Sequence, residues 1–146
     1  MSDLFEPFRL DGCVALVTGA SSGFGRHFGS VLARAGARVA LGARRIERVK
    51  NACDEITAAG GEAIAVTLDV TDTDTIREAF EATEQALGLV TVVVNNAGIT
   101  IPKPLVDLEG GDWSAVIDTT LNGVAYVTRE ASQRMIAAGQ GGSVIN

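Results

Sequence analysis

Three glycines and two serines lie within seven positions in the stretch Thr18–Gly25, which reads TGASSGFG. Glycine is needed where the main chain turns sharply and approaches a ligand too closely for a Cβ atom. A helix that begins at such a turn offers unpaired N–H groups to an anion. These features favour binding of a dinucleotide pyrophosphate, and a tight turn without a ligand is the alternative. The residues expected at this site are Gly19, Ser21, Ser22, Gly23, Phe24 and Gly25.

A nucleoside triphosphate is a poor fit to the same stretch. The glycine spacing is not G-x-G-x-x-G, and the lysine of a P-loop is absent. Arg26, which follows Gly25, does not stand at the position that the P-loop motif gives to its lysine. The P-loop lysine contacts the β- and γ-phosphates, so its absence removes the main cation of such a site.

Two arginines, Arg44 and Arg45, follow the second apolar segment, about twenty residues after the glycine stretch. An NAD site usually carries an acid at this distance to bind the ribose 2′-hydroxyl. Here that acid is missing. Positive charge gains nothing at a helix N-terminus, and a bound 2′-phosphate would offset this cost. We therefore expect NADP in preference to NAD. Two solvated surface arginines are the alternative.

Asp69 and Val70 follow the third apolar segment. We expect Thr71 to cap the next helix, which would leave the Asp69 carboxylate free. A carboxylate at this edge of a sheet could accept a hydrogen bond from an adenine amino group. The alternative is a turn in which Asp69 binds its own backbone.

Apolar segments alternate with helical patterns along the whole chain, which indicates repeated βα units and a parallel sheet. We expect one α/β domain over residues 1–146, with the element order βαβαβαβαβ and a fifth strand that is cut short. An unbroken helix capped by Asp112 and running to Ala138 would be about 40 Å long. The expected strands are 13–18, 38–42, 63–68, 90–95 and one opening at 143, and the other expected helices are 24–35, 46–59 and one from 71 to 87.

The last predicted helix is apolar more than halfway round at Val124–Val127. A stripe this wide suggests that two sides of the helix are covered, one by its own sheet and the other by a partner subunit. A sheet that ends at a partial fifth strand would also leave an unpaired edge, which favours pairing with another chain. We therefore expect a homo-oligomer.

Composition narrows the other partners. Twelve Lys and Arg against eighteen Asp and Glu give a net charge of -6, which disfavours nucleic acid and anionic membrane surfaces. Cys13 and Cys53 lie forty positions apart and suggest neither a disulfide framework nor a metal site. We expect two buried, reduced thiols, no membrane span, and a cytoplasmic protein.

The glycine stretch, Leu68–Val70 (LDV) and Asn95–Gly98 (NNAG) together resemble the short-chain dehydrogenase/reductase family, from about Leu10 to Asn146. The resemblance implies a doubly wound, Rossmann-type fold and hydride transfer between a nicotinamide and a small carbonyl or alcohol substrate. By the same resemblance, Gly19, Ser21, Gly23 and Phe24 would line the pyrophosphate, Arg44 the 2′-phosphate, Asp69 and Val70 the adenine, and Asn96, Ala97 and Gly98 would border the nicotinamide ribose and strengthen the sheet.

The sequence departs from the family's catalytic pattern of Ser, Tyr, Lys and Asn. Where the family has N-L-x-G, the chain reads TLNG, so Thr120 occupies the Asn position. Tyr126 begins no Y-x-x-x-K, and the family's Ser would come just beyond Asn146. We expect the cofactor-binding part of an NADP(H)-dependent oxidoreductase, truncated at the fifth strand and inactive by itself. The alternative is a catalytically silent NADP(H)-binding or oligomerisation module.

Overall fold

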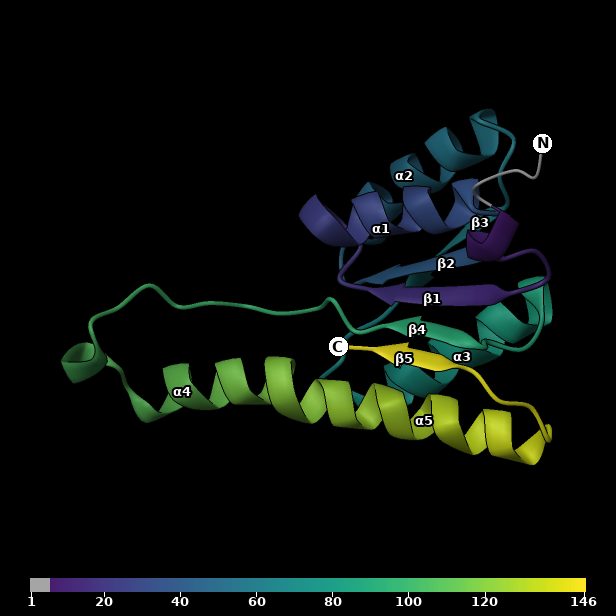
Figure 1. Cartoon of the computed structure of the whole chain (residues 1–146). Helices are drawn as coiled ribbons and strands as arrows, with labels where there is room; N and C mark the ends of the chain where they lie inside the picture. The colour runs from purple at the N-terminus through teal and green to yellow at the C-terminus, as the bar shows by residue number, and fades with distance from the viewer. Residues whose placement is uncertain (1–5) are drawn as a thin grey trace.

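A computed structural model describes residues 6–146. Residues 1–5 of the single domain expected over residues 1–146 lie outside this described range. The centre of the fold is a five-stranded, all-parallel sheet in the order β3-β2-β1-β4-β5 (Figure 1). The predicted parallel α/β fold is confirmed, and β4, a strand of three residues, is shorter than the predicted 90–95. The strands are β1 (Val14–Thr18), β2 (Arg38–Ala43), β3 (Ala63–Thr67), β4 (Val92–Val94) and β5 (Ser143–Ile145).

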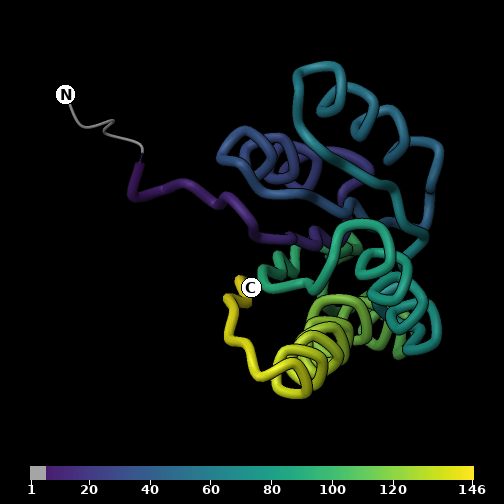
Figure 2. The backbone as a smooth tube through the Cα atoms, turned by 90° about the vertical axis from the view of Figure 1, so that its right-hand side faces the viewer, coloured from purple at the N-terminus to yellow at the C-terminus, as the bar shows by residue number. Residues whose placement is uncertain are grey.

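Helices cover both faces of this sheet, as Figures 1 and 2 show from two directions. Strand β1 divides its side chains between the two faces: Val14 and Leu16 enter one buried cluster, and Ala15 and Val17 enter the other. A strand buried on both faces reads as a continuous apolar run, which explains the sequence VALVT. One face carries α1 (Gly23–Arg34) and α2 (Ile46–Ala58), and the other carries α3 (Thr73–Leu87) and α5 (Gly123–Ala137).

The order in which strands are added to the sheet reverses at β1: β2 and β3 lie on one side of it, and β4 and β5 lie on the other. Strand β2 pairs with one edge of β1, and β4 pairs with the other, with Val17 opposite Val94. The loops that leave the carboxyl ends of β1 and β4 therefore begin side by side. In open α/β sheets this switch point opens a crevice that binds ligands.

The segment between β4 and α5 extends away from the body of the molecule (Figure 1). It contains a short 3-10 turn, η2 (Leu105–Asp107), and the helix α4 (Gly110–Ile117). A π-helical turn, η3 (Asp118–Asn122), joins α4 to α5. A further 3-10 turn, η1 (Glu6–Phe8), begins the described chain.

The helix expected from Asp112 to Ala138 begins earlier, at Gly110, and is not one unbroken α-helix. Glu109 occupies the N-cap position, and Asp112, two residues into the helix that starts at Gly110, accepts a hydrogen bond from the Glu109 N–H at 3.1 Å. The turn η3 then interrupts the α-helical pattern. Its side chains contribute to the break: the Thr120 hydroxyl donates to the Val116 carbonyl at 2.6 Å. Threonine bonds of this kind compete with the helix backbone.

The two cysteines differ in environment. Both thiols are free, and Cys53 is buried whereas Cys13 is only half-buried, so the expectation of two buried thiols is wrong for Cys13. Burial, with a smaller contribution from the Asp54 charge, raises the pKa of Cys53 to about 11. Cys53 therefore stays protonated and unreactive at neutral pH.

Candidate functional site

The turn between β1 and α1 is built around glycines that the backbone requires. Gly19 and Gly23 have φ angles of 67° and 58°, the left-handed region that residues with a Cβ rarely adopt. A Cβ on Gly19 would also lie 2.7 Å from the Cα of Ala97. Gly25 allows the close approach of Asn96, because a Cβ atom at position 25 would overlap the side-chain nitrogen of Asn96. The turn therefore brings the loop after β4 against the start of α1.

Asn96 joins the carboxyl ends of the two neighbouring strands. Its side-chain nitrogen donates to the carbonyls of Thr18 at 3.0 Å and Gly19 at 3.2 Å. In return, the Thr18 hydroxyl accepts hydrogen bonds from the backbone N–H groups of Asn96 at 3.1 Å and Ala97 at 3.0 Å. The side-chain amide of Asn96 thus links the loop after β4 to the carboxyl end of β1.

A groove of about 350 Å³ opens at this edge of the sheet. Of the residues predicted from the sequence, the structure brings together Gly19, Ser21, Ser22, Phe24, Arg44, Arg45, Asp69, Val70, Asn96, Ala97 and Gly98 in its lining. Gly23 and Gly25 do not line it and act through the backbone of the turn. Four lining residues were missed by sequence reasoning: Ala43, Leu68, Ile99 and Thr119.

Strand ends explain some of the missed residues but not all. Ala43 ends β2 and Leu68 directly follows β3, so both lie at the carboxyl edge that the strand pattern already indicated. Thr119 belongs to η3, a turn that no sequence pattern predicted. Its place in the groove depends on how α5 packs against the sheet.

The N-terminus of α1 and two arginines give the groove positive potential. Within residues 6–146, the Ser22 side chain at the N-cap makes no capping hydrogen bond, so the first N–H groups of the twelve-residue helix α1 are not satisfied by it. Arg44 and Arg45 are both exposed, and neither side chain has an ion-pair or hydrogen-bond partner in the described chain. An anion in this groove would meet a helix dipole and two guanidinium groups.

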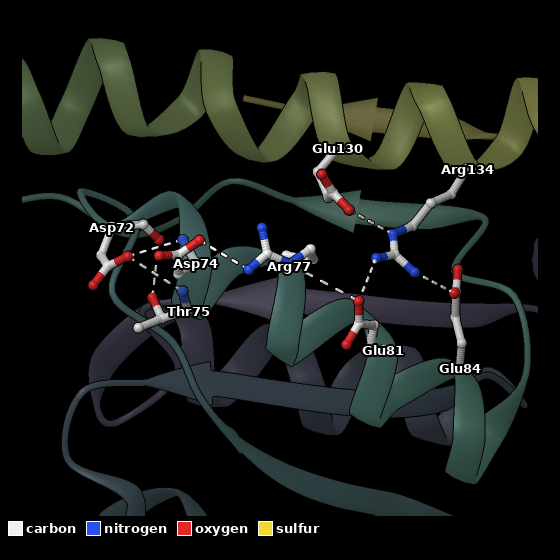
Figure 3. Close-up of polar contacts among 8 residues, drawn as sticks. All are labelled: Asp72, Asp74, Thr75, Arg77, Glu81, Glu84, Glu130 and Arg134. Atoms are coloured by element: carbon white, nitrogen blue, oxygen red, sulfur yellow. Dashed lines mark hydrogen bonds and ion pairs between the residues drawn. The ribbon is translucent and has the colours of Figure 1, made fainter.

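Asp69 is less free than the sequence suggested. Its Oδ1 atom accepts hydrogen bonds from the Thr71 N–H at 3.0 Å and the Thr71 hydroxyl at 2.8 Å. Thr71 is not the helix cap; Asp72 caps α3 by accepting from the N–H groups of Asp74 and Thr75, at 2.9 and 3.3 Å (Figure 3). The alternative interpretation of Asp69, a turn that binds its own backbone, is the one observed, and the residue still lines the groove.

Thr120 and Tyr126, the residues at or near the family's catalytic pattern, do not line the groove. The Thr120 hydroxyl is used by the Val116 carbonyl, and the Asn122 amide donates to Asp118 at 2.8 Å. Tyr126 packs against the core on α5, with the Arg129 guanidinium 5.5 Å from its ring centroid. The groove can bind an anionic ligand, but neither Tyr nor Lys is among its described lining residues.

Among residues 6–146, no group of three or more His, Cys, Asp or Glu side chains could hold a metal ion. No helix in the same range is both long and apolar enough to cross a bilayer.

The sheet order and the position of the groove define a doubly wound, Rossmann-type α/β protein. The chain belongs to the short-chain dehydrogenase family, whose model matches residues 13–146. This confirms the resemblance carried by the glycine stretch and NNAG.

Individual relatives agree with this assignment. The chain is 37% identical over 134 residues to gluconate 5-dehydrogenase of Gluconobacter oxydans, a match that covers 92% of this chain and 52% of that protein. It is 39% identical over 138 residues to 3-oxoacyl-[acyl-carrier-protein] reductase of Thermotoga maritima, covering 94% of this chain and 56% of that protein.

A solved structure shows the same fold. A short-chain type dehydrogenase/reductase from Mycobacterium marinum superposes with a TM-score of 0.91 at 34% identity, covering 94% of this chain and 56% of the other. The chain thus spans about half the length of the relatives that it matches.

Proposed function

We propose that this chain is the cofactor-binding part of an NADP(H)-dependent oxidoreductase that transfers hydride between the nicotinamide and a carbonyl or alcohol. The observation that carries the proposal is the position of Arg44 and Arg45, two unpaired cations in the same groove as the N-terminus of α1. The helix N-terminus suits the pyrophosphate, and the arginines suit a 2′-phosphate.

The rest of the groove fits the other parts of the dinucleotide. Val70 offers an apolar wall to the adenine, and the Asp69 carboxylate keeps Oδ2 as an acceptor for the adenine amino group because Oδ1 is engaged by Thr71. Asn96, Ala97 and Gly98 border the nicotinamide ribose. Ser21, Ser22 and Phe24 border the pyrophosphate beside the glycine turn. When bound, the cofactor would donate hydride in its reduced form or accept it in its oxidised form.

The names of the relatives support oxidoreduction as the activity of the whole protein, since one is a dehydrogenase and the other a reductase. The substrate class, a small carbonyl or alcohol, is proposed on the same ground. The chain by itself is proposed not to consume NADPH, because its one Tyr is held in a packing contact and begins no Y-x-x-x-K.

A catalytically silent NADP(H)-binding module is the second candidate. The observation that favours it is Thr120, whose hydroxyl is bound to the helix backbone and replaces the family's Asn. The candidates differ in the full-length gene product. A silent module binds NADPH and leaves its 340 nm absorbance unchanged over a panel of aldehydes and ketones, whereas an enzyme consumes it with at least one of them.

Calorimetry with NADP+ and NAD+ tests cofactor binding and cofactor preference. We expect Arg44→Ala to weaken NADP+ binding roughly 10- to 100-fold, the value of one or two hydrogen bonds to a charged group, and to leave NAD+ binding unchanged. Arg48→Ala is the matched control, because Arg48 is likewise an exposed arginine but lies on α2 and does not line the groove.

Two results would contradict the proposal. Equal affinities of the unaltered chain for NAD+ and NADP+ would contradict the proposal that the arginines bind the 2′-phosphate. The absence of binding heat with both dinucleotides would contradict the proposed cofactor-binding function itself.

A further inference from the structure

We infer that the crevice between α1 and α2 is a second ligand site, which binds the carboxylate of a small organic acid. The two helices lie in the layer that covers one face of the sheet (Figures 1 and 2), and their buried residues Ala33 and Ile56 belong to one apolar cluster. The crevice has a volume of about 480 Å³. Small-ligand sites usually have about 300–1,000 Å³. No described residue lines both this crevice and the cofactor groove, so its ligand is independent of the dinucleotide.

The crevice is closed at two places along α1. In the first turn of α1, the Arg26 Nη2 atom donates to both carboxylate oxygens of Glu55 on α2. At the last turn, Gly61 meets α1: a Cβ atom on Gly61 would lie 2.8 Å from an Ile56 methyl carbon and 3.4 Å from the Ala33 Cβ atom. The space between these two contacts is therefore bounded by both helices and by the turn after α2.

One face of α1 supplies the polar groups of the crevice. Arg26, Ser30 and Arg34 are spaced by four residues, so they lie on the same face of the helix, and all three line the crevice. Within residues 6–146, neither the Ser30 hydroxyl nor the Arg34 guanidinium has a hydrogen-bond or ion-pair partner. Two guanidinium groups with a hydroxyl between them can donate several hydrogen bonds to one carboxylate.

The helix dipole explains only one of these three residues. A cation in the last turn of a helix offsets the dipole, and Arg34 is the basic residue of the last turn of α1. Arg26 lies in the first turn, where positive charge gains nothing from the dipole. Ser30 lies between them, with its hydroxyl unpaired in the described chain. A bound carboxylate would use all three side chains.

The walls of the crevice limit the size and charge of its ligand. Ala33, Ala52 and Ile56 are buried and give the crevice an apolar floor, which suits a short hydrocarbon body. Ala59, the C-cap residue of α2, also lines the crevice, and the last turn of α1 lies beside it. Helix C-termini carry partial negative charge, which would oppose a dianion more than a single carboxylate. We therefore expect a compact monocarboxylate.

Sodium butyrate, a short monocarboxylate, is a suitable probe. In an NMR titration of the isotopically labelled chain, we expect saturable shifts of the backbone amide resonances of Gly60 and Gly61, with a Kd on the order of 1 mM. Butanol has the same hydrocarbon chain and no charge, and should bind at least about tenfold more weakly. Sulfate, a dianion, should also bind more weakly than butyrate.

Three outcomes of this titration would overturn the inference. Equal binding of butyrate and butanol would mean that the crevice does not recognise a carboxylate. Tighter binding of sulfate would contradict the preference for a single charge. Butyrate shifts concentrated at Arg44 and Gly98 would place the anion in the cofactor groove, which those two residues line.

Two arginine variants test the guanidinium contact. We expect Arg34→Met to weaken butyrate binding by about tenfold, because the carboxylate loses the guanidinium that has no other partner in the described chain. Arg48→Met removes an exposed arginine of α2 that does not line the crevice, and should leave the affinity unchanged. An equal loss in both variants would overturn the inference.

Two glutamate variants should act in the opposite direction from each other's expectation of charge alone. Glu55→Gln releases Arg26 from its ion pair, and we expect butyrate to bind about three- to tenfold more tightly. Glu47→Gln removes the same charge from the same helix, but its partner is Lys50 and it does not line the crevice, so the affinity should not change. Equal tightening in both variants would show that net charge, and not Arg26, is responsible, and would contradict the site.

Discussion

At the scale of single residues, Asn96 has a structural role that can be separated from cofactor contact. Its side-chain nitrogen satisfies two carbonyls, those of Thr18 and Gly19, at the point where the loops after β1 and β4 meet. Each of these carbonyls belongs to a partly or fully buried residue, so a lost donor is costly. The residue thereby maintains the shape of the groove before any ligand enters.

We expect Asn96→Ala to lower the free energy of unfolding by about 1–3 kcal/mol, because both carbonyls lose their donor. Urea denaturation measures this change. Asn122→Ala removes an amide whose partner is the exposed Asp118 side chain and should cost below about 1 kcal/mol. Equal losses in the two variants would contradict the structural role of Asn96.

At the scale of elements, Arg134 on α5 fastens that helix to α3. Its guanidinium contacts Glu130 at 2.7 Å and Glu84 at 2.6 Å, with Glu81 at 3.8 Å (Figure 3). It also lies 5.6 Å from the ring centroid of Phe80. Burial acts to lower the pKa of Arg134, but the hydrogen bonds to Glu130 and Glu84 outweigh it and raise the pKa.

We expect Arg134→Met to lower the free energy of unfolding by about 2–3 kcal/mol, because Glu84 and Glu130 would be left as uncompensated, mostly buried charges. The Arg134 side chain is only 20% exposed. Arg77→Met is the control: that side chain is 52% exposed, and its ion pair with Asp74 should contribute at most about 1 kcal/mol.

Chemical denaturation at neutral pH measures both variants. A second measurement at low pH, where the glutamates are protonated, should narrow the difference between Arg134→Met and the unaltered chain. A difference that is the same at both pH values would mean that the apolar contact with Phe80, and not the charge network, carries the effect.

At the scale of the whole molecule, two sets of exposed apolar side chains lie on separate helical layers. One set follows the α4–α5 layer, where Leu121 is 60% exposed and Ile136 77%. The other lies on α1, where Val31 is 44% exposed. The inner side of α5 is formed by Val127, Ala131 and Met135, which are buried on the chain's own sheet. The last helix, for which a wide apolar stripe was predicted, is therefore covered by the chain's own sheet on its inner side only, and its outer side is exposed.

We propose that the outer side of α4 and α5 meets a second copy of the chain, as the apolar stripe predicted. Sedimentation should then show an oligomer at micromolar concentration, and Ile136→Lys should shift it toward monomer by placing a charge in the interface. Val31→Lys places the same charge on the other layer and should leave the oligomer intact. A monomer in the unaltered chain, or an equal response to both variants, would contradict this.

Short-range patterns in the sequence determined the strands, the glycine turn and most of the groove. Continuous apolar runs specify strands buried on both faces, and the carboxyl ends of parallel strands meet at one edge. That is why the strand pattern predicts Arg44 and Asp69 at a common site, although they lie in separate loops, whereas Asn96 was predicted there from the resemblance to the family.

Tertiary structure decided which of several chemically equivalent residues makes each contact. Thr71 and Asp72 are both good caps, and only the path of the chain after β3 selected Asp72 and turned Thr71 toward Asp69. The π-helical turn and Thr119 in the groove follow from how α5 packs. Contacts such as Asn96 to Thr18, 78 positions apart, leave no local signal, because their energy depends on where the folded sheet places the two partners.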